Sequence, residues 1–186
     1  ERYWPQMRRL GLPRYQFSAR GVRIGGSWFA YARENTTTNA ALFAWYLIYH
    51  LKGCGVDLSQ VVFQTDNGSE FIGNPVKKGK SAFQEVLESF GVKWVRIPPS
   101  SPTWNSDVET FHGLIEDEFY AVEDYRDGGE FMGKAWAYQL WFNYKRKNRN
   151  RGRKAPLEIF EEIPHREISP EVFNLPPLIV DQLLPA

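Results

Sequence analysis

The chain has 186 residues, of which 42% are hydrophobic and 16% aromatic, and its formal net charge is +1. This length and apolar content suit one globular domain with a substantial core and argue against a disordered chain. The single cysteine, Cys54, excludes an intrachain disulfide framework, and no window holds the roughly 18 uninterrupted apolar residues of a membrane span. We therefore expect a soluble, cytoplasmic protein with no membrane partner.

The N-terminal region predicts a lead-in followed by a β-hairpin. Residues 1–13 are mostly polar and contain two prolines, which predicts an irregular chain. Apolar and polar residues alternate over 15–19 and continue an alternating pattern over 28–33, on either side of Gly25-Gly26. Such alternation around a glycine turn is typical of two antiparallel strands.

A helix and a strand are predicted next. A broad apolar stripe over 40–51 predicts a core-facing helix, which residues 36–39 can cap and Gly53 ends. Residues 60–65 are rich in β-branched and aromatic side chains and predict a buried strand that ends in a turn at Asn67-Gly68.

The remaining elements complete an alternating pattern. Apolar residues at helical spacing predict helices over 81–90, 108–119 and 130–147, and residues 92–97 predict another strand. The order of hairpin, helix, strand, helix, strand and helix predicts an α/β layer architecture. Prolines recur after residue 155 and allow only short helical turns, so we expect a core over 1–154 and a tail over 155–186, packed on that core or on another protomer.

Charge is distributed unevenly along the chain. Residues 145–154 contain seven basic side chains and no acid, whereas residues 107–130 contain nine acids and one base. One region would attract phosphates and the other cations, which suits an enzyme that grips a nucleic-acid backbone and acts on it with metal ions. The simpler alternative is that both runs are solvated faces.

Two carboxylates stand at positions suited to a shared metal. Asp66 follows the predicted strand at its carboxyl end, and Glu109 lies in the first turn of the helix predicted over 108–119. Each also has an ordinary interpretation, since an Asp often starts a turn and an acid in the first turn of a helix is favoured by the helix dipole.

Two motifs, in this order along the chain, resemble those of one superfamily. They are QTDNGSEF at 64–71 and IPPSSPTWNSDVETFHGLIEDEF at 97–119, with supporting matches at 3–20 and 138–160. The chain resembles the catalytic core of the retroviral-integrase and DDE-transposase superfamily and, within it, the bacterial insertion-sequence transposases. The resemblance covers most of the chain and implies an α/β fold of the ribonuclease H-like type, with a mixed sheet flanked by helices.

The resemblance implies catalytic residues, a metal and a reaction. Asp66 and Glu109 would be two of three metal ligands, and two Mg²⁺ or Mn²⁺ ions are expected in the complete site, because hard cations prefer carboxylate oxygens. The implied reaction is hydrolysis at a DNA end followed by attack of the freed 3′-hydroxyl on target DNA.

The sequence departs from the family pattern at three places. The family's first Asp lies on a strand before the hairpin, but Asp57 is the only Asp before Asp66. We therefore expect the chain as given to begin just after that first, central strand, which leaves a vacancy beside Asp66 and Glu109. The 42 residues between Asp66 and Glu109 exceed the retroviral spacing, and Gly21 stands where relatives often have an Asp.

Further site residues and partners follow from the resemblance. DNA is the expected partner, as element ends and as target, and a homo-oligomer is expected because two ends must be handled together. His112 and Glu116 share a helical face with Glu109 and are candidates for lining the site. The candidates for contacting DNA are two Asn residues and the basic run, namely Asn67, Asn105, Lys145, Arg146, Lys147, Arg149, Arg151, Arg153 and Lys154.

Three functions remain open at this point. The first is a DNA transposase or integrase core. The second is a domain that binds DNA or a partner without catalysis, because the first Asp is absent. The third is a ribonuclease H-type nuclease that cleaves RNA–DNA hybrids without joining strands.

Overall fold

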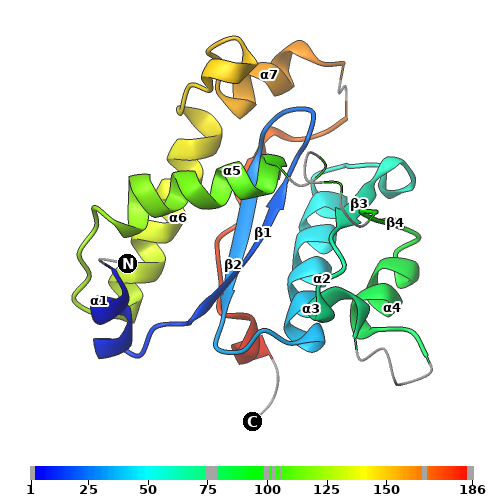
Figure 1. Cartoon of the computed structure of the whole chain (residues 1–186). Helices are drawn as coiled ribbons and strands as arrows, with labels where there is room; N and C mark the ends of the chain where they lie inside the picture. Colours follow the sequence, from blue (N-terminus) through cyan, green and yellow to red (C-terminus); the bar gives the residue numbers. More distant parts are fainter. Residues whose placement is uncertain are drawn as a thin grey trace.

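The computed structural model describes residues 3–73, 79–98, 101, 104, 106–164 and 167–183. Its strands are β1 (Tyr15–Arg20), β2 (Ser27–Ala32), β3 (Val62–Thr65) and β4 (Lys93–Arg96). The helices are α1 (Trp4–Arg9), α2 (Thr37–Gly53), α3 (Ser69–Ile72), α4 (Ala82–Ser89), α5 (Ser106–Ile115), α6 (Gly128–Tyr144) and α7 (Pro156–Glu162). The π-helix η3 (Glu116–Tyr120) continues α5, and short 3₁₀ turns cover Leu58–Gln60, Arg149–Arg151, Pro170–Phe173 and Val180–Leu183 (Figure 1).

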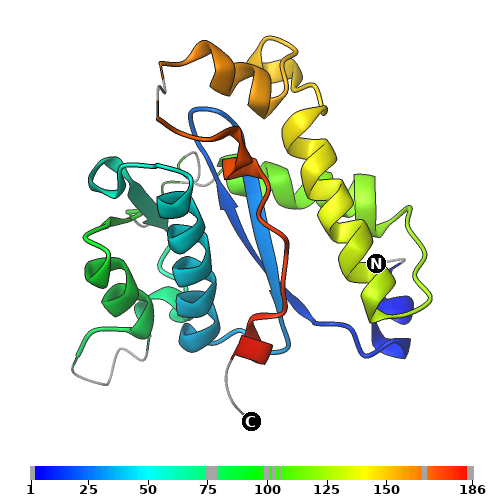
Figure 2. The ribbon, with the colours of Figure 1, turned by 180° about the vertical axis from the view of Figure 1, so that it is seen from behind.

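The described strands form two separate pairs. β1 and β2 are antiparallel, with Tyr15 opposite Ala32, and β3 and β4 are parallel, with Val62 opposite Lys93. The sequence predicts one mixed sheet, so this expectation is met only in part. In Figures 1 and 2, β1 is the strand of its pair that lies nearer to β3 and β4.

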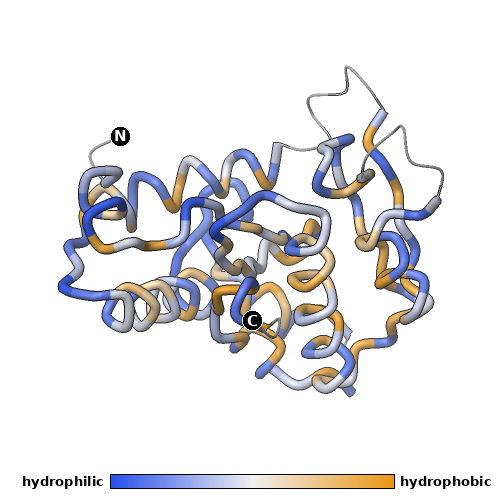
Figure 3. Tube along the Cα trace, turned by 90° about the horizontal axis from the view of Figure 1, so that it is seen from below, coloured by the Kyte–Doolittle hydropathy of each residue, from blue (hydrophilic) through white to orange (hydrophobic). Residues whose placement is uncertain are grey.

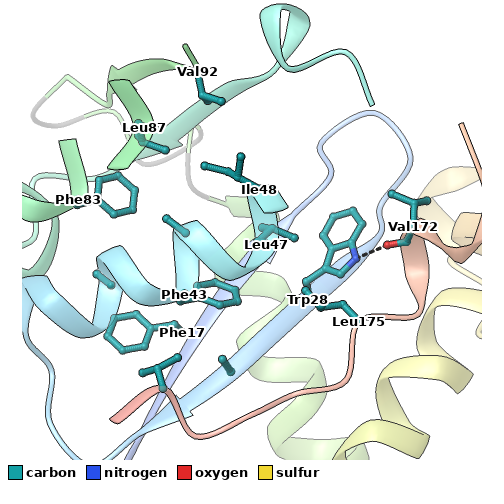
Figure 4. Packing of buried hydrophobic residues seen from close by; sticks show 14 of the residues in the cluster. Phe17, Trp28, Phe43, Leu47, Ile48, Phe83, Leu87, Val92, Val172 and Leu175 are labelled. Atoms are coloured by element: carbon teal, nitrogen blue, oxygen red, sulfur yellow. Dashed lines mark hydrogen bonds between the residues drawn. The ribbon is translucent and has the colours of Figure 1, made fainter. Parts of the chain in front are cut away.

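Both faces of β2 are covered, and every residue of this strand is buried. Trp28, Ala30 and Ala32 point into a cluster with α2 and α4, whereas Phe29 and Tyr31 point into a second cluster with α5, η3 and α6. Figure 4 shows the first cluster, in which the Trp28 indole donates a hydrogen bond to the carbonyl oxygen of Val172 at 2.8 Å. The hairpin is therefore the central layer between two groups of helices.

The outer edge of β2 is closed by side chains and by the C-terminal segment. Gln139 and Asn143, one turn apart on α6, accept hydrogen bonds from the backbone N–H groups of Phe29 and Ser27 at 3.1 and 2.8 Å. Further along the strand, the Tyr31 N–H donates to the carbonyl oxygen of Leu178 at 2.8 Å. Backbone groups that would otherwise be unpaired at a sheet edge are thus satisfied inside the protein.

The segment after residue 155 contributes to the main core. Phe160, Val172, Phe173, Leu175 and Val180 are all buried in the cluster around α2 and β2. In Figure 2 this segment, coloured orange to red, runs across the back of the hairpin. These five side chains are covered by the chain itself.

Several predicted elements are confirmed at nearly the expected bounds. The hairpin, the helix capped by Thr36 and the strand before Asp66 are all present. The helix predicted over 81–90 is α4, which is capped by Ser81 and followed by Gly91 at a φ of 69°. A glycine in this left-handed conformation is a common way to end a helix.

Two expectations about local structure are wrong. Residues 4–9 form helix α1 rather than irregular chain, because Pro5 fits a first helical turn and Met7 is buried in the second cluster. The strand β3 is not fully buried, since the side chain of Val62 is 53% exposed. Only one face of β3 packs inward, where Phe63 contacts Phe83 of α4.

No helix within the described ranges is long and apolar enough to cross a membrane. Figure 3 shows hydrophilic residues spread along the helices between the hydrophobic ones.

Candidate active site at the ends of β3 and α5

Asp66 lies in the turn that follows β3. Its Oδ1 accepts a hydrogen bond from the Gly68 N–H at 3.0 Å, and the residue is exposed. The neighbouring Asn67 donates from its side-chain amide to the carbonyl oxygen of Ile97 at 2.9 Å, which fixes the turn to the end of β4. Asp66 is therefore a turn residue that keeps carboxylate surface open to solvent. One amide N–H of Asn67 is engaged in a hydrogen bond within the protein.

Glu109 lies in the first turn of α5 and is exposed. Within the residues that the structure describes, its carboxylate makes no hydrogen bond or ion pair, in contrast to several acids nearby. A carboxylate without a protein partner is available to a cation, and the helix dipole favours negative charge at this end.

Trp104, which precedes α5, contacts β3. Gln64, on β3, donates a hydrogen bond from Nε2 to the carbonyl oxygen of Trp104 at 2.8 Å. Trp104 is five residues before Glu109, and Gln64 is two residues before Asp66. The contact places Trp104 beside the strand that precedes Asp66.

Asp107 fastens the first turn of α5 to the hairpin. Its two carboxylate oxygens accept hydrogen bonds from Nη2 of Arg151 at 3.1 and 2.9 Å, and Nη2 of Arg20 lies 3.8 Å away. The other end of the Arg151 guanidinium donates to the carbonyl oxygens of Val22 and Arg23 at 2.9 and 3.1 Å. Three parts of the chain that are far apart in sequence are thus joined two residues from Glu109.

Arg20 is the buried member of this network. Its side chain is 3% exposed and lies between the rings of Phe111 and Phe142, with guanidinium-to-centroid distances of 5.3 and 5.1 Å. Desolvation by burial lowers the pKa of Arg20, and the Asp107 carboxylate opposes that change. The charge of Arg20 is therefore held in the interior by Asp107 and by two aromatic faces.

The basic run forms a loop after α6, and its side chains fall into two groups. Arg151 and three others are engaged with acids: Arg146 pairs with Glu118, Lys147 with Glu158 and Lys154 with Glu162. The second group is exposed and forms no ion pair among the described residues, and its members are Lys145, Arg149 and Arg153. A role in DNA binding stays a prediction for both groups, and the second group is the one free to meet phosphates. Asn105 lies outside the described residues.

His112 and Glu116 lie one and two turns after Glu109 along the same helix. Both line a hollow of about 220 Å³ between α1, β1 and α5. Desolvation lowers the pKa of His112, and the carboxylates of Glu116 and Glu109 oppose this. The two residues therefore border a distinct pocket next to Glu109.

The metal chemistry has two candidate ligands. No group of three or more His, Cys, Asp or Glu side chains placed to hold a metal occurs in the described part of the chain. Asp66 and Glu109 supply only hard oxygen donors, which fits Mg²⁺ or Mn²⁺, because Mg²⁺ is often held by one or two carboxylates together with waters and substrate phosphates.

Sequence reasoning missed the network around Asp107. Asp107 and Arg151 lie in runs of like charge, so each is indistinguishable from its neighbours until the fold pairs them. Arg20 gave no signal either, because an arginine in an alternating strand is ordinarily on the solvent face.

Comparison with known proteins identifies the fold and nothing closer. No protein-family model matches the sequence, and no curated protein is significantly similar to it. Among solved structures, the chain is similar to the catalytic core domain of BIV integrase. The two share 18% sequence identity and a TM-score of 0.53, over 79% of this chain and 85% of that one.

Proposed function

We propose that this chain is the catalytic core of a DNA transposase or integrase that cleaves DNA ends and transfers the strands to target DNA. The observation that carries the proposal is the position of Asp66 and Glu109. Both are exposed carboxylates, one after a strand end and the other in a first helical turn, and a hydrogen bond joins Gln64 and Trp104, which lie shortly before them in the chain. They lie on a fold similar to a retroviral integrase core. The motifs that resemble bacterial insertion-sequence transposases support that narrower assignment.

In this proposal Asp66 and Glu109 hold Mg²⁺ or Mn²⁺. Such ions, when bound, activate the attacking oxygen and stabilise the leaving oxygen of a phosphodiester. The chain's own contribution is to fix the two carboxylates on rigid elements. Asn67 ties the Asp66 turn to the end of β4 through the carbonyl oxygen of Ile97. Asp107 ties the Glu109 turn to the hairpin through Arg151.

The DNA backbone would be gripped by the exposed basic side chains after α6. Lys145, Arg149 and Arg153 are the described members of the run that form no ion pair. Phosphate contacts of this kind position DNA without reading its sequence. The proposal therefore leaves recognition of element ends to other parts of the protein or to other contacts.

The third carboxylate of the family would come from a strand between β1 and β3. Each of these strands pairs with only one other described strand, so each has an edge at which another strand can add. A strand paired to both edges would join the two pairs into one mixed sheet. Its Asp would then lie beside Asp66.

A second candidate function is binding without catalysis. It is favoured by one observation, the lack of a three-ligand group among the described residues. Under this alternative the exposed basic side chains still hold DNA, but Asp66 and Glu109 have no catalytic role.

The test is strand joining by the full-length protein. We expect it, with Mg²⁺ or Mn²⁺, to join duplex ends from a random-sequence pool to a supercoiled plasmid, with junctions detected by sequencing. Asp66→Asn and Glu109→Gln should each abolish joining and weaken Mn²⁺ binding measured by calorimetry, whereas Asp117→Asn, at an exposed acid two turns from Glu109, should do neither.

Joining that is unchanged in both variants would disprove the assigned site. DNA binding with no metal-dependent joining in any variant would support the binding domain, and cleavage of RNA–DNA hybrid without joining would support the nuclease.

A further inference from the structure

The hollow beside Glu109 has aromatic walls and a polar rim. Helix α1 lies near the carboxyl end of α5, where η3 begins (Figure 1). The walls include Tyr3, Trp4 and Tyr15, and the rim includes Arg14, His112 and Glu116. The volume of about 220 Å³ is below the range of roughly 300–1,000 Å³ that drug-sized ligands occupy. The space suits a single planar ring system.

The floor of the hollow is hydrogen-bonded and uncharged. The hydroxyl groups of Tyr120 and Tyr31 lie 2.9 Å apart, and the Tyr120 hydroxyl also bonds the side-chain carbonyl of Gln16. Burial raises the pKa of both tyrosines, so they stay protonated at neutral pH. A ligand that reaches the floor therefore meets neutral, already satisfied groups, which favours an uncharged aromatic ring over a phosphate.

The rim has one charge of each sign. The guanidinium of Arg14 lies over the Tyr15 ring, 5.5 Å from its centroid, and Arg14 is exposed. The Glu116 carboxylate accepts a hydrogen bond from the Tyr3 hydroxyl at 3.1 Å and is also exposed. A carboxylate has acceptor capacity left after one such bond, and it attracts N–H donors while repelling phosphate.

We propose that this hollow receives one unstacked nucleobase of the DNA substrate, held between aromatic rings with its exocyclic amino group toward Glu116 and its phosphate toward Arg14. The inference rests on the proposed function, because it is the DNA strand bound at Glu109 that delivers the base. Residues three apart on a helix are neighbours about 5–6 Å apart at Cβ, so His112 places the hollow within one nucleotide of a phosphodiester at Glu109. Stacking of single bases on aromatic side chains is a general mode of binding unpaired DNA.

The test uses a fluorescent base in DNA. We would place 2-aminopurine, whose fluorescence reports stacking, at each terminal position in turn of a duplex with a short single-stranded overhang. The full-length protein is titrated without divalent metal, so that binding is observed without chemistry. One terminal position should show a saturable fluorescence change, and replacing that base by an abasic site should weaken binding about tenfold, as expected for the loss of one stacked base.

Protein variants locate the effect. Trp4→Ala removes a wall and Glu116→Ala removes the rim carboxylate, and both should abolish the fluorescence change at that position and weaken binding about tenfold. Glu116 is exposed, so its variant tests the proposal even if Trp4→Ala does not fold. Asp117→Ala is the matched control, because it removes the same charge at the adjacent exposed residue, which does not line the hollow.

The outcomes separate this proposal from the function on which it rests. If the protein joins DNA ends but no terminal base changes its fluorescence, or if Glu116→Ala behaves as Asp117→Ala, the base site is wrong and the proposed function stands. If Asp66→Asn has no effect on joining while Trp4→Ala and Glu116→Ala still lose the base signal, the base site stands and the catalytic assignment falls. A protein that binds no DNA refutes both.

Discussion

Replacing Asn143 by leucine tests how the edge of β2 is closed. Asn143 is fully buried, and its side chain makes two hydrogen bonds of 2.8 Å to the backbone N–H and C=O of Ser27 and a longer one of 3.4 Å to the carbonyl of Phe173. Leucine has a similar size, so Asn143→Leu creates no large cavity. The change isolates the loss of hydrogen bonds.

The magnitude follows from the two short bonds. Ser27 is itself 0% exposed, so neither of its backbone groups can turn to water after the substitution. Each buried group left without a partner costs about 1–3 kcal/mol, which gives about 2–6 kcal/mol for the pair. Domains are stable by only about 5–15 kcal/mol, so the loss is a large share of the total.

Urea denaturation of the purified chain, followed by tryptophan fluorescence, measures the effect. With an m-value of about 2 kcal/mol/M, a loss of about 3 kcal/mol lowers the unfolding midpoint by about 1.5 M. Asn150→Leu is the matched control, because it makes the same replacement at an exposed position and should stay within about 0.5 kcal/mol of the parent. If Asn143→Leu also stays within that limit, the reasoning about buried backbone groups is wrong.

Three further predictions concern other parts of the fold. Asp107→Ala leaves the buried Arg20 charge without its carboxylate, and we expect the free energy of unfolding in the same urea assay to fall by about 1–3 kcal/mol. The lower end is expected because Asp107 is 31% exposed. An unchanged midpoint would show that the network contributes no stability. The pKa of His112 is lowered in the folded state, so stability falls as pH drops below the unfolded-state pKa of about 6.5. His112→Gln should flatten the dependence of stability on pH between pH 7 and 5. An identical slope in both proteins would contradict this. Gly55 has a φ of 87° and a Cβ there would overlap a backbone carbonyl oxygen, so Gly55→Ala should strongly destabilise the protein in thermal unfolding. Gly53→Ala, at an open position that ends α2, should be neutral or slightly stabilising. Equal shifts in the two variants would refute the distinction.

Local sequence patterns specified most of the regular elements. Alternation around Gly25-Gly26 predicted the hairpin, and the stripe between Thr36 and Gly53 predicted α2, because strand and helix periodicities and their caps act over a few residues. The same reasoning placed Asp66 at a strand end and Glu109 in a first helical turn. Patterns that extend over a few residues can therefore be identified from the sequence alone.

Local patterns failed where the partner of a segment is distant. Residues 4–9 are helical because Met7 is buried in a cluster with residues of α5, η3 and α6. In β3, only one face is buried, and Val62 on the other face is 53% exposed. Only tertiary contacts could show either. The division of the basic run is likewise visible only in the fold, since acids distant in sequence pair with Arg146 and Arg151.

The sequence by itself determined most of the regular elements, the resemblance and the two carboxylates of the candidate site. Tertiary structure alone decided that Asp107 holds the Glu109 turn through Arg151, and that Asn143 closes the edge of β2 across 116 positions of sequence. The physical reason is the range of the interactions. Propensity and capping depend on neighbours within a turn, whereas burial and charge pairing depend on which distant side chains the fold brings into contact.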